Sequence, residues 1–190
     1  MENHELIKYT IFKTKWGYFG LAGTELWLCR SCLPLPQREK VESQLLAYVD
    51  AAEYDKGFFK TLQEQITAYF EGALVNFSPD IPIVLDGLGN FAGQVLTACR
   101  DIKFGQTISY SGLAKRIGRA GSARAIGNTL AKNPLPLIIP CHRVIKSNGE
   151  IGGFSAVGGK NLKAKLLRHE QETLMNCKSG ELNRLRRDFF

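Results

Sequence analysis

The chain has 190 residues, enough for one large or two small domains with a buried core, and its 44% hydrophobic and 23% charged residues are ordinary for a globular protein. Five scattered cysteines argue against a secreted disulfide framework, and without a signal-peptide pattern or a membrane-length apolar run we expect an intracellular protein. The net charge of +7 favours a polyanionic partner such as nucleic acid, although a merely soluble basic surface accounts for it equally well.

The first third of the chain has the pattern of an antiparallel sheet followed by helices. Aromatic and β-branched segments separated by turn residues predict a meander of three strands, at 9–13, 16–22 and 25–33. Four-residue apolar spacing then predicts core-packing helices at 37–49 and 57–71, and a last strand follows at 81–85. The glycine-rich stretch that comes next is the clearest domain boundary in the chain.

Two cysteines in the predicted sheet have a spacing that zinc ligands use. Cys29 and Cys32 could supply half of a tetrahedral site, but no second ligand pair accompanies them. We therefore interpret both thiols as structural, and we expect neither a metal nor another cofactor.

After the boundary the sequence becomes helical. Apolar spacing predicts helices at 91–102, 111–117 and 122–132, and a tight glycine-bearing turn joins the last two into a helix-turn-helix. Ser122 is expected to cap the third helix, and Pro134 is expected to end it.

The third helix divides into two faces. Small and apolar residues repeat on one face, whereas Arg124, Asn128 and Lys132 repeat at four-residue steps and should point outward together. Such a polar face is usually only solvated. It would also suit a nucleic-acid groove, with the long side chain of Arg124 projecting into it.

The stretch 138–145 is an apolar run interrupted by Cys141, His142 and Arg143. A thiol is a strong nucleophile only as the thiolate, and burial in an apolar run raises its pKa and makes it inert. The stretch alone therefore favours a core cysteine on a short strand, unless a neighbouring positive charge or base lowers the thiol pKa. We expect Arg143 to form a structural ion pair.

This stretch has a specific context. The pentapeptide Pro-Cys-His-Arg-Val at 140–144, with Asn-Pro at 133–134 before it and Gly-Gly-Phe-Ser at 152–155 and Leu-Leu-Arg-His-Glu at 166–170 after it, resembles the active-site signature of the O6-alkylguanine-DNA alkyltransferases, also called methylated-DNA-protein-cysteine methyltransferases. Order and spacing match from about residue 91 to 170. The resemblance implies DNA repair by irreversible, single-turnover transfer of an alkyl group from O6-alkylguanine, and from O4-alkylthymine, to Cys141.

The resemblance also implies roles for individual residues. Glu170, His142 and a water would relay the proton of Cys141, Tyr110 would hydrogen-bond the flipped guanine, and Asn133 would link the DNA-binding helix to the active-site segment. Arg124 would enter the base stack from the minor groove of double-stranded DNA. The remaining assignments are Ser122, Ala123, Asn128 and Lys132 to DNA binding, and Val144, Phe154 and Ser155 to the substrate pocket. Many relatives carry tyrosine where this chain has Phe154, so we expect an altered substrate range.

Two geometric expectations accompany these roles. Neighbouring residues on a regular strand point to opposite faces, so His142 should reach Cys141 only through a bridging water. Glu170 should lie at the end of a helix spanning about 160–169, where the macrodipole disfavours a carboxylate unless an imidazole compensates it.

Together these patterns predict an α/β (α+β) fold in a monomer. We expect a supporting N-terminal domain with an antiparallel sheet and helices at 1–86, a mostly helical DNA-binding and active-site domain at 87–175, and a basic tail at 176–190. Two other functions stay open. The protein could be a helix-turn-helix regulator in which Cys141 is a sensor or inert. It could also be a cysteine hydrolase, although His142 is adjacent to Cys141 in sequence and His169 has no recognisable hydrolase context.

Overall fold

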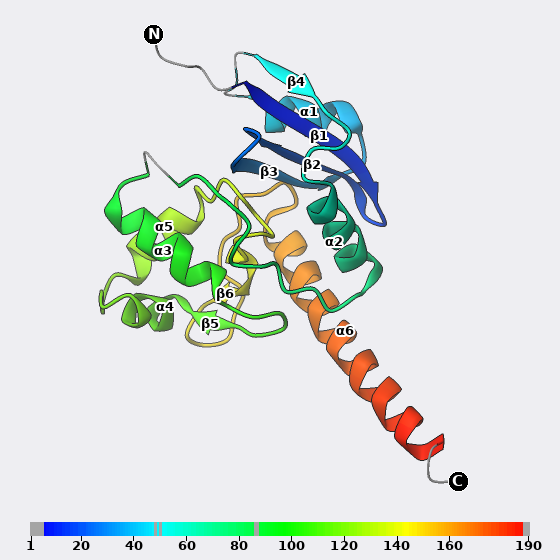
Figure 1. The fold of residues 1–190 in the computed structure, drawn as a ribbon. Helices are drawn as coiled ribbons and strands as arrows, with labels where there is room; N and C mark the ends of the chain where they lie inside the picture. Colours follow the sequence, from blue (N-terminus) through cyan, green and yellow to red (C-terminus); the bar gives the residue numbers. More distant parts are fainter. Residues whose placement is uncertain (1–5, 48, 50, 86–87, 188–190) are drawn as a thin grey trace.

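The structure is a computed structural model that describes residues 6–47, 49, 51–85 and 88–187, with side chains described up to residue 179. A four-stranded sheet with two helices forms the N-terminal part, and helices with a two-stranded β-pair form the C-terminal part (Figure 1). This arrangement confirms the expected fold class. The predicted boundary after residue 86 falls at 86–87, outside the described residues, and stays a prediction.

The sheet has the order β3-β2-β1-β4. Its antiparallel strands β1 (Ile7–Thr14), β2 (Gly17–Gly23) and β3 (Leu28–Leu35) confirm the predicted meander. The short β4 (Ala52–Tyr54), parallel to β1 at the sheet edge, was not predicted.

The strand predicted at 81–85 is wrong. This segment forms only an isolated bridge between Ile83 and Leu28, in which Leu28 N donates to Pro82 O and Val84 N donates to Leu28 O, both at 2.9–3.0 Å. Pro82 lacks an N–H group and cannot extend the ladder. The segment is therefore a connecting loop that pairs with β3 at one point and continues into the C-terminal part.

Each face of the sheet packs against different elements. Helix α1 (Arg38–Leu45) covers one face with Val41 and Leu45, so closely that a Cβ atom on Gly20 would lie 2.8 Å from Val41. Helix α2 (Lys60–Glu71) covers the other face. The core on that side continues into the C-terminal part, so the two parts share buried side chains, among them Phe19, Leu62, Ile66, Phe70, Val95, Cys99, Ile139 and Leu166.

Three helices pack together in the C-terminal part. Helices α3 (Asn90–Arg100), α4 (Tyr110–Arg116) and α5 (Ala123–Leu130) contact one another, and α4 and α5 form the predicted helix-turn-helix. Ser109 caps α4 by accepting a 2.9 Å hydrogen bond from Gly112 N. Ser122 is the N-cap residue of α5, as predicted, but the side-chain cap expected there does not form. Only the backbone oxygen of Ser122 accepts a bond, from Ile126 N, and its hydroxyl makes no capping contact.

The cysteine segment is not a strand, contrary to the prediction. Cys141–Arg143 forms a 3-10 turn, η1, in which Arg143 N donates to Pro140 O at 2.9 Å. The strand pairing begins only afterwards, where β6 (Val144–Ile145) runs parallel to β5 (Ile108–Ser109). The tight turn follows from Pro140, whose ring restricts φ and favours a turn over an extended strand.

Helix α6 (Gly159–Arg187) is far longer than predicted and leaves the body of the molecule toward the C-terminus (Figure 1). No glycine or proline interrupts 160–179, so nothing stops the helix at His169. Glu170 therefore lies inside the helix, and the expected conflict with a helix terminus does not arise. Throughout the part of the chain that the structure describes, helices are too short or too polar to span a bilayer.

Candidate active site

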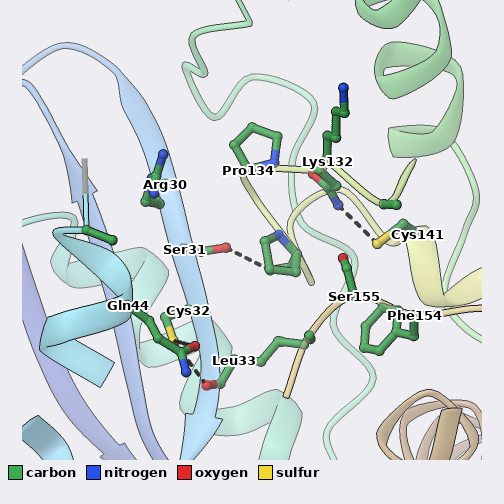
Figure 2. Close-up of a pocket in the computed structure, with 15 residues that line it drawn as sticks. Arg30, Ser31, Cys32, Leu33, Gln44, Lys132, Pro134, Cys141, Phe154 and Ser155 are labelled. Atoms are coloured by element: carbon green, nitrogen blue, oxygen red, sulfur yellow. Dashed lines mark hydrogen bonds between the residues drawn. The ribbon is translucent and has the colours of Figure 1, made fainter. Parts of the chain in front are cut away.

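Cys141 follows a loop that is held from two directions. Asn133 donates through Nδ2 to Ile139 O at 2.8 Å and to Cys141 Sγ at 3.1 Å, and its Oδ1 accepts from Leu135 N. Ser31 of β3 donates through Oγ to Pro136 O at 2.9 Å (Figure 2). Inside the loop Leu137 has φ +79°, a left-handed conformation that a branched side chain adopts only under constraint. The loop geometry that presents Cys141 is therefore imposed by its surroundings.

Cys141 lines two neighbouring cavities, although the residue is only 6% exposed to solvent. A cavity of about 480 Å³ opens between α5 and the loop 152–155. A second cavity, of about 600 Å³, lies between that loop and β3, with Phe154 and Ser155 near Cys141 and Arg30, Ser31 and Cys32 across from them (Figure 2). The thiol is thus buried but can be approached.

The structure gathers most of the predicted site residues around these cavities. On α5, Ile126 and Leu130 are buried, whereas Arg124 and Asn128 are exposed, as predicted. Lys132 is exposed as well, but α5 ends at Leu130, before the predicted helix end. The cavity beside α5 is lined by Cys141 together with Tyr110, Ala123, Arg124, Asn128, Phe154 and Ser155, and the second cavity by Cys141 with Lys132, Asn133, Phe154 and Ser155. Ser122, Val144, His142 and Glu170 line neither.

A buried ion-pair network lies behind Cys141. Glu170 is fully buried and accepts hydrogen bonds from His142 Nε2 at 2.8 Å, Arg143 Nη2 at 2.8 Å, Gly105 N at 2.9 Å and the Tyr69 hydroxyl at 2.9 Å. Burial alone would raise the pKa of Glu170, but the hydrogen bonds and charges of His142 and Arg143 lower it to about 2. The carboxylate is therefore ionised at neutral pH, and the ion pair expected of Arg143 is confirmed.

The network fixes the tautomer of His142. An ionised carboxylate can only accept, so Nε2 carries the proton that is donated to Glu170 Oε1, and Nδ1 is left as an acceptor. Burial lowers the pKa of His142, with the hydrogen bond that it donates to Glu170 acting in the opposite direction, so the imidazole is neutral at pH 7. Nδ1 is buried and finds no hydrogen-bond partner among the described residues.

The thiol of Cys141 is protonated at rest. Burial raises the pKa of Cys141 above its ordinary value, while the hydrogen bond from Asn133 and the ammonium group of Lys163 act in the opposite direction. The nearby charge that favours the thiolate therefore comes from Lys163 and not from the sequence neighbours His142 and Arg143.

Lys163 was not predicted as a site residue. It lies on α6, is 1% exposed, and donates through Nζ to Val144 O and, at 3.4 Å, to the Tyr110 hydroxyl. The carbonyl that accepts this bond belongs to Val144, which the resemblance assigns to the substrate pocket. The seven-residue spacing of Lys163 and Glu170, which places both on one helix face, was the signal in the sequence that could have found it.

Tyr110 is held against the loop that closes the cavity. A Cβ atom at Gly152 would clash with the ring and hydroxyl of Tyr110, so only glycine permits this approach. The ammonium of Lys163 lies 5.5 Å from the centroid of the same ring. The phenol hydroxyl thus lies beside Gly152 and Lys163, and Tyr110 lines the cavity that Cys141 also lines.

Cys29 and Cys32, the pair with zinc-like spacing, make separate contacts. Cys29 Sγ donates to Ala22 O, and Cys32 Sγ contacts Leu33 O and Gln44 Oε1. Burial raises the pKa of Cys32 to about 11. Within the described ranges, His, Cys, Asp and Glu side chains form no cluster of three or more that could hold a metal.

Comparisons with known proteins agree with this geometry. Residues 90–172 match the family model described as 6-O-methylguanine DNA methyltransferase, DNA binding domain. A curated methylated-DNA-protein-cysteine methyltransferase of Methanosarcina acetivorans is 33% identical over 162 residues, which cover 85% of this chain and 97% of the relative. The protein of the same name from Mycobacterium tuberculosis H37Rv is 40% identical over 117 residues, 62% of this chain and 68% of the relative.

Solved structures give the same result. The crystal structure of Mycobacterium tuberculosis OGT in complex with DNA aligns with a TM-score of 0.73 and 33% identity over 87% of this chain and 94% of that one. The O6-methylguanine-DNA methyltransferase of Pyrococcus kodakaraensis, at 18% identity and a TM-score of 0.65, shares the fold. Because this match covers nearly the full length of the Methanosarcina acetivorans relative, the chain belongs to the methylated-DNA-protein-cysteine methyltransferase family.

Proposed function

We propose that this protein repairs DNA by transferring the alkyl group of O6-alkylguanine, and of O4-alkylthymine, to the sulfur of Cys141. The observation that carries the proposal is the position of Cys141, at a cavity bordered by α5 and Tyr110 and backed by the buried His142 and Glu170. A regulator with an inert cysteine would have no need of an ionised carboxylate and a neutral imidazole buried beside that thiol.

The exposed face of α5 would bind double-stranded DNA along the minor groove, in a monomeric, intracellular protein. An alkyl group on O6 lies inside the duplex, so the nucleotide must rotate out at a cost of about a few kcal/mol. Arg124 is exposed and lines the same cavity as Cys141, so its side chain would fill the gap in the stack while the base enters. Ser122, Ala123, Asn128 and Lys132 would contact the flanking backbone.

Activation of the thiol would use the acceptor atom of His142. A water molecule between Cys141 Sγ and His142 Nδ1 would carry the thiol proton to the imidazole, and Glu170 would stabilise the imidazolium through its 2.8 Å bond to Nε2. Asn133 and Lys163 would stabilise the thiolate as it forms. The raised pKa of the resting thiol makes such a relay necessary.

The displacement forms a sulfur–carbon bond and breaks the bond between the alkyl carbon and O6. The leaving guanine anion would be stabilised by a hydrogen bond from Tyr110, and it ends as guanine after taking up a proton. Phe154 and Ser155 would form the pocket wall, with Phe154 contributing packing but no hydroxyl. The product is a thioether on Cys141, which a second base cannot displace, so each molecule reacts once.

A stoichiometric repair assay tests this function. A duplex oligonucleotide with one O6-methylguanine is mixed with increasing protein and then digested to nucleosides. We expect O6-methylguanine to be replaced by guanine up to one lesion per protein molecule, and no repair by Cys141→Ala that still binds the duplex. Binding without any loss of the lesion would favour the regulator instead.

A further inference from the structure

Tyr69 connects the N-terminal part of the chain to the relay behind Cys141. It lies on α2, is fully buried, and donates its hydroxyl to Glu170 Oε1 at 2.9 Å across 101 residues of sequence. The same oxygen accepts the 2.8 Å bond from His142 Nε2. One carboxylate oxygen, which also accepts a 2.8 Å bond from Arg143 Nη2, is therefore shared between a side chain of the N-terminal part and the imidazole next to Cys141.

The position of Tyr69 is fixed on several sides. Its backbone oxygen accepts a 2.6 Å hydrogen bond from His169 Nε2, the residue before Glu170. Its ring packs edge-on against Phe70 and Phe104, with centroids 5.1 and 5.7 Å away. Because α6 contacts both the backbone and the hydroxyl of Tyr69, the hydroxyl has a defined direction toward Glu170.

The phenol is a neutral donor, as are His142 Nε2 and Gly105 N, whereas Arg143 brings a positive charge to Glu170. The charged groups acting on His142 are Glu170 and Lys163 on α6 and Arg143 on η1. A neutral donor at Oε1 restricts the carboxylate and draws electron density from it without adding a charge. It thereby weakens the hydrogen bond that Glu170 accepts from His142 Nε2, which makes the imidazole less basic. It also helps to direct Nδ1 toward Cys141.

We infer that Tyr69 is a positioning residue for the relay, through which the N-terminal part sets the orientation and basicity of His142. The inference rests on the proposed function, in which His142 takes up the proton of Cys141. Without this hydroxyl the Glu170 carboxylate that orients His142 is less restricted. Because a hydrogen bond to a charged group is stronger than one between neutral groups, its loss should slow alkyl transfer about tenfold.

The chain offers a matched pair of variants for the test. Tyr69→Phe removes only the hydroxyl that reaches Glu170, whereas Tyr9→Phe removes the same group from a second tyrosine–glutamate pair, between Tyr9 of β1 and Glu42 of α1. The single-turnover rate constant is measured against pH and oligonucleotide concentration. For Tyr69→Phe we expect a maximal rate about tenfold lower, an unchanged half-saturating concentration, and an acid limb moved to higher pH. Tyr9→Phe should leave all three unchanged.

A second measurement separates this inference from the proposed function. Nitrogen NMR titration of His142 needs no DNA, and in Tyr69→Phe its pKa should rise because Oε1 loses a competing donor. Incorporation of 3-fluorotyrosine at position 69 keeps the packing, strengthens the donor and should lower that pKa, which decides the matter if Tyr69→Phe does not fold. A wild-type His142 titration in either folded variant would overturn the inference, whether or not the protein repairs DNA.

Discussion

Asn133 donates one amide group to both Ile139 O and Cys141 Sγ, at 2.8 and 3.1 Å, and so joins the end of α5 to the reactive sulfur. The bond to sulfur favours the thiolate, against a burial that disfavours it. Asn133→Ala should therefore raise the pKa of Cys141 further and slow its alkylation by iodoacetamide at pH 7.5 about tenfold. Asn148→Ala, on an exposed turn, serves as control. Equal alkylation rates for wild type and Asn133→Ala would show that the amide does not act on the thiol.

The pair formed by Arg143 and Glu170 should dominate the stability of the active-site region. Arg143→Leu leaves a buried carboxylate without its permanent counter-charge, and we expect the free energy of unfolding to fall by about 3–5 kcal/mol in urea titrations. Lys146→Met breaks a pair of similar length, with Glu150, on the surface and should leave the unfolding midpoint unchanged. A similar loss in both variants would mean that burial does not decide the strength of these pairs.

Acid should destabilise the protein through Glu170. Its pKa is about 2 in the folded chain and 4.5 ordinarily, so the unfolded state binds a proton first as the pH falls. The stabilisation from the ionised carboxylate is complete above pH 4.5 and is lost toward pH 2. In thermal unfolding scans, wild type should be more stable than Glu170→Gln at pH 7, and the difference should shrink through this range. A constant difference at every pH would contradict an ionised, paired Glu170.

Arg124 should matter for duplex DNA and not for the free base. Arg124→Ala removes the side chain proposed to replace the extruded nucleotide, and a loss of about 1.4 kcal/mol of that support would slow repair of duplex about tenfold. The reaction with free O6-methylguanine should keep its rate, as should both reactions of Lys103→Ala, an exposed cation on another segment. Equal slowing of duplex and free base by Arg124→Ala would argue against a wedge.

Local patterns predicted much of this molecule. Periodicity located the strands of the meander and the helix-turn-helix, and the signature around Cys141 named His142, Glu170, Tyr110 and Asn133, which the structure places close to the thiol or directly behind it. The periodicity predictions succeeded because each depends on neighbours within a short stretch of chain, whereas the site residues came from the resemblance to a known family, and their individual roles stay predictions.

The features that were missed depend on contacts between distant segments or on the absence of a stop signal. The edge strand β4 pairs with β1 across more than forty residues of sequence, and Tyr69 reaches Glu170 across 101. In the sequence Lys163 cannot be distinguished from a solvent-exposed helix lysine, and only the folded structure shows that it is buried. The 3-10 turn at Cys141 contradicted the strand predicted from the short apolar run 138–145. The continuation of α6 past His169 contradicted the helix end predicted there.

The most direct measurement of the central claim is the mass of the protein after reaction with duplex DNA carrying O6-methylguanine. The account predicts one added methyl group per molecule, found on the peptide that contains Cys141 and absent from Cys141→Ala. Folded protein that binds this DNA but keeps its original mass, or that carries the methyl group on another residue, would contradict it.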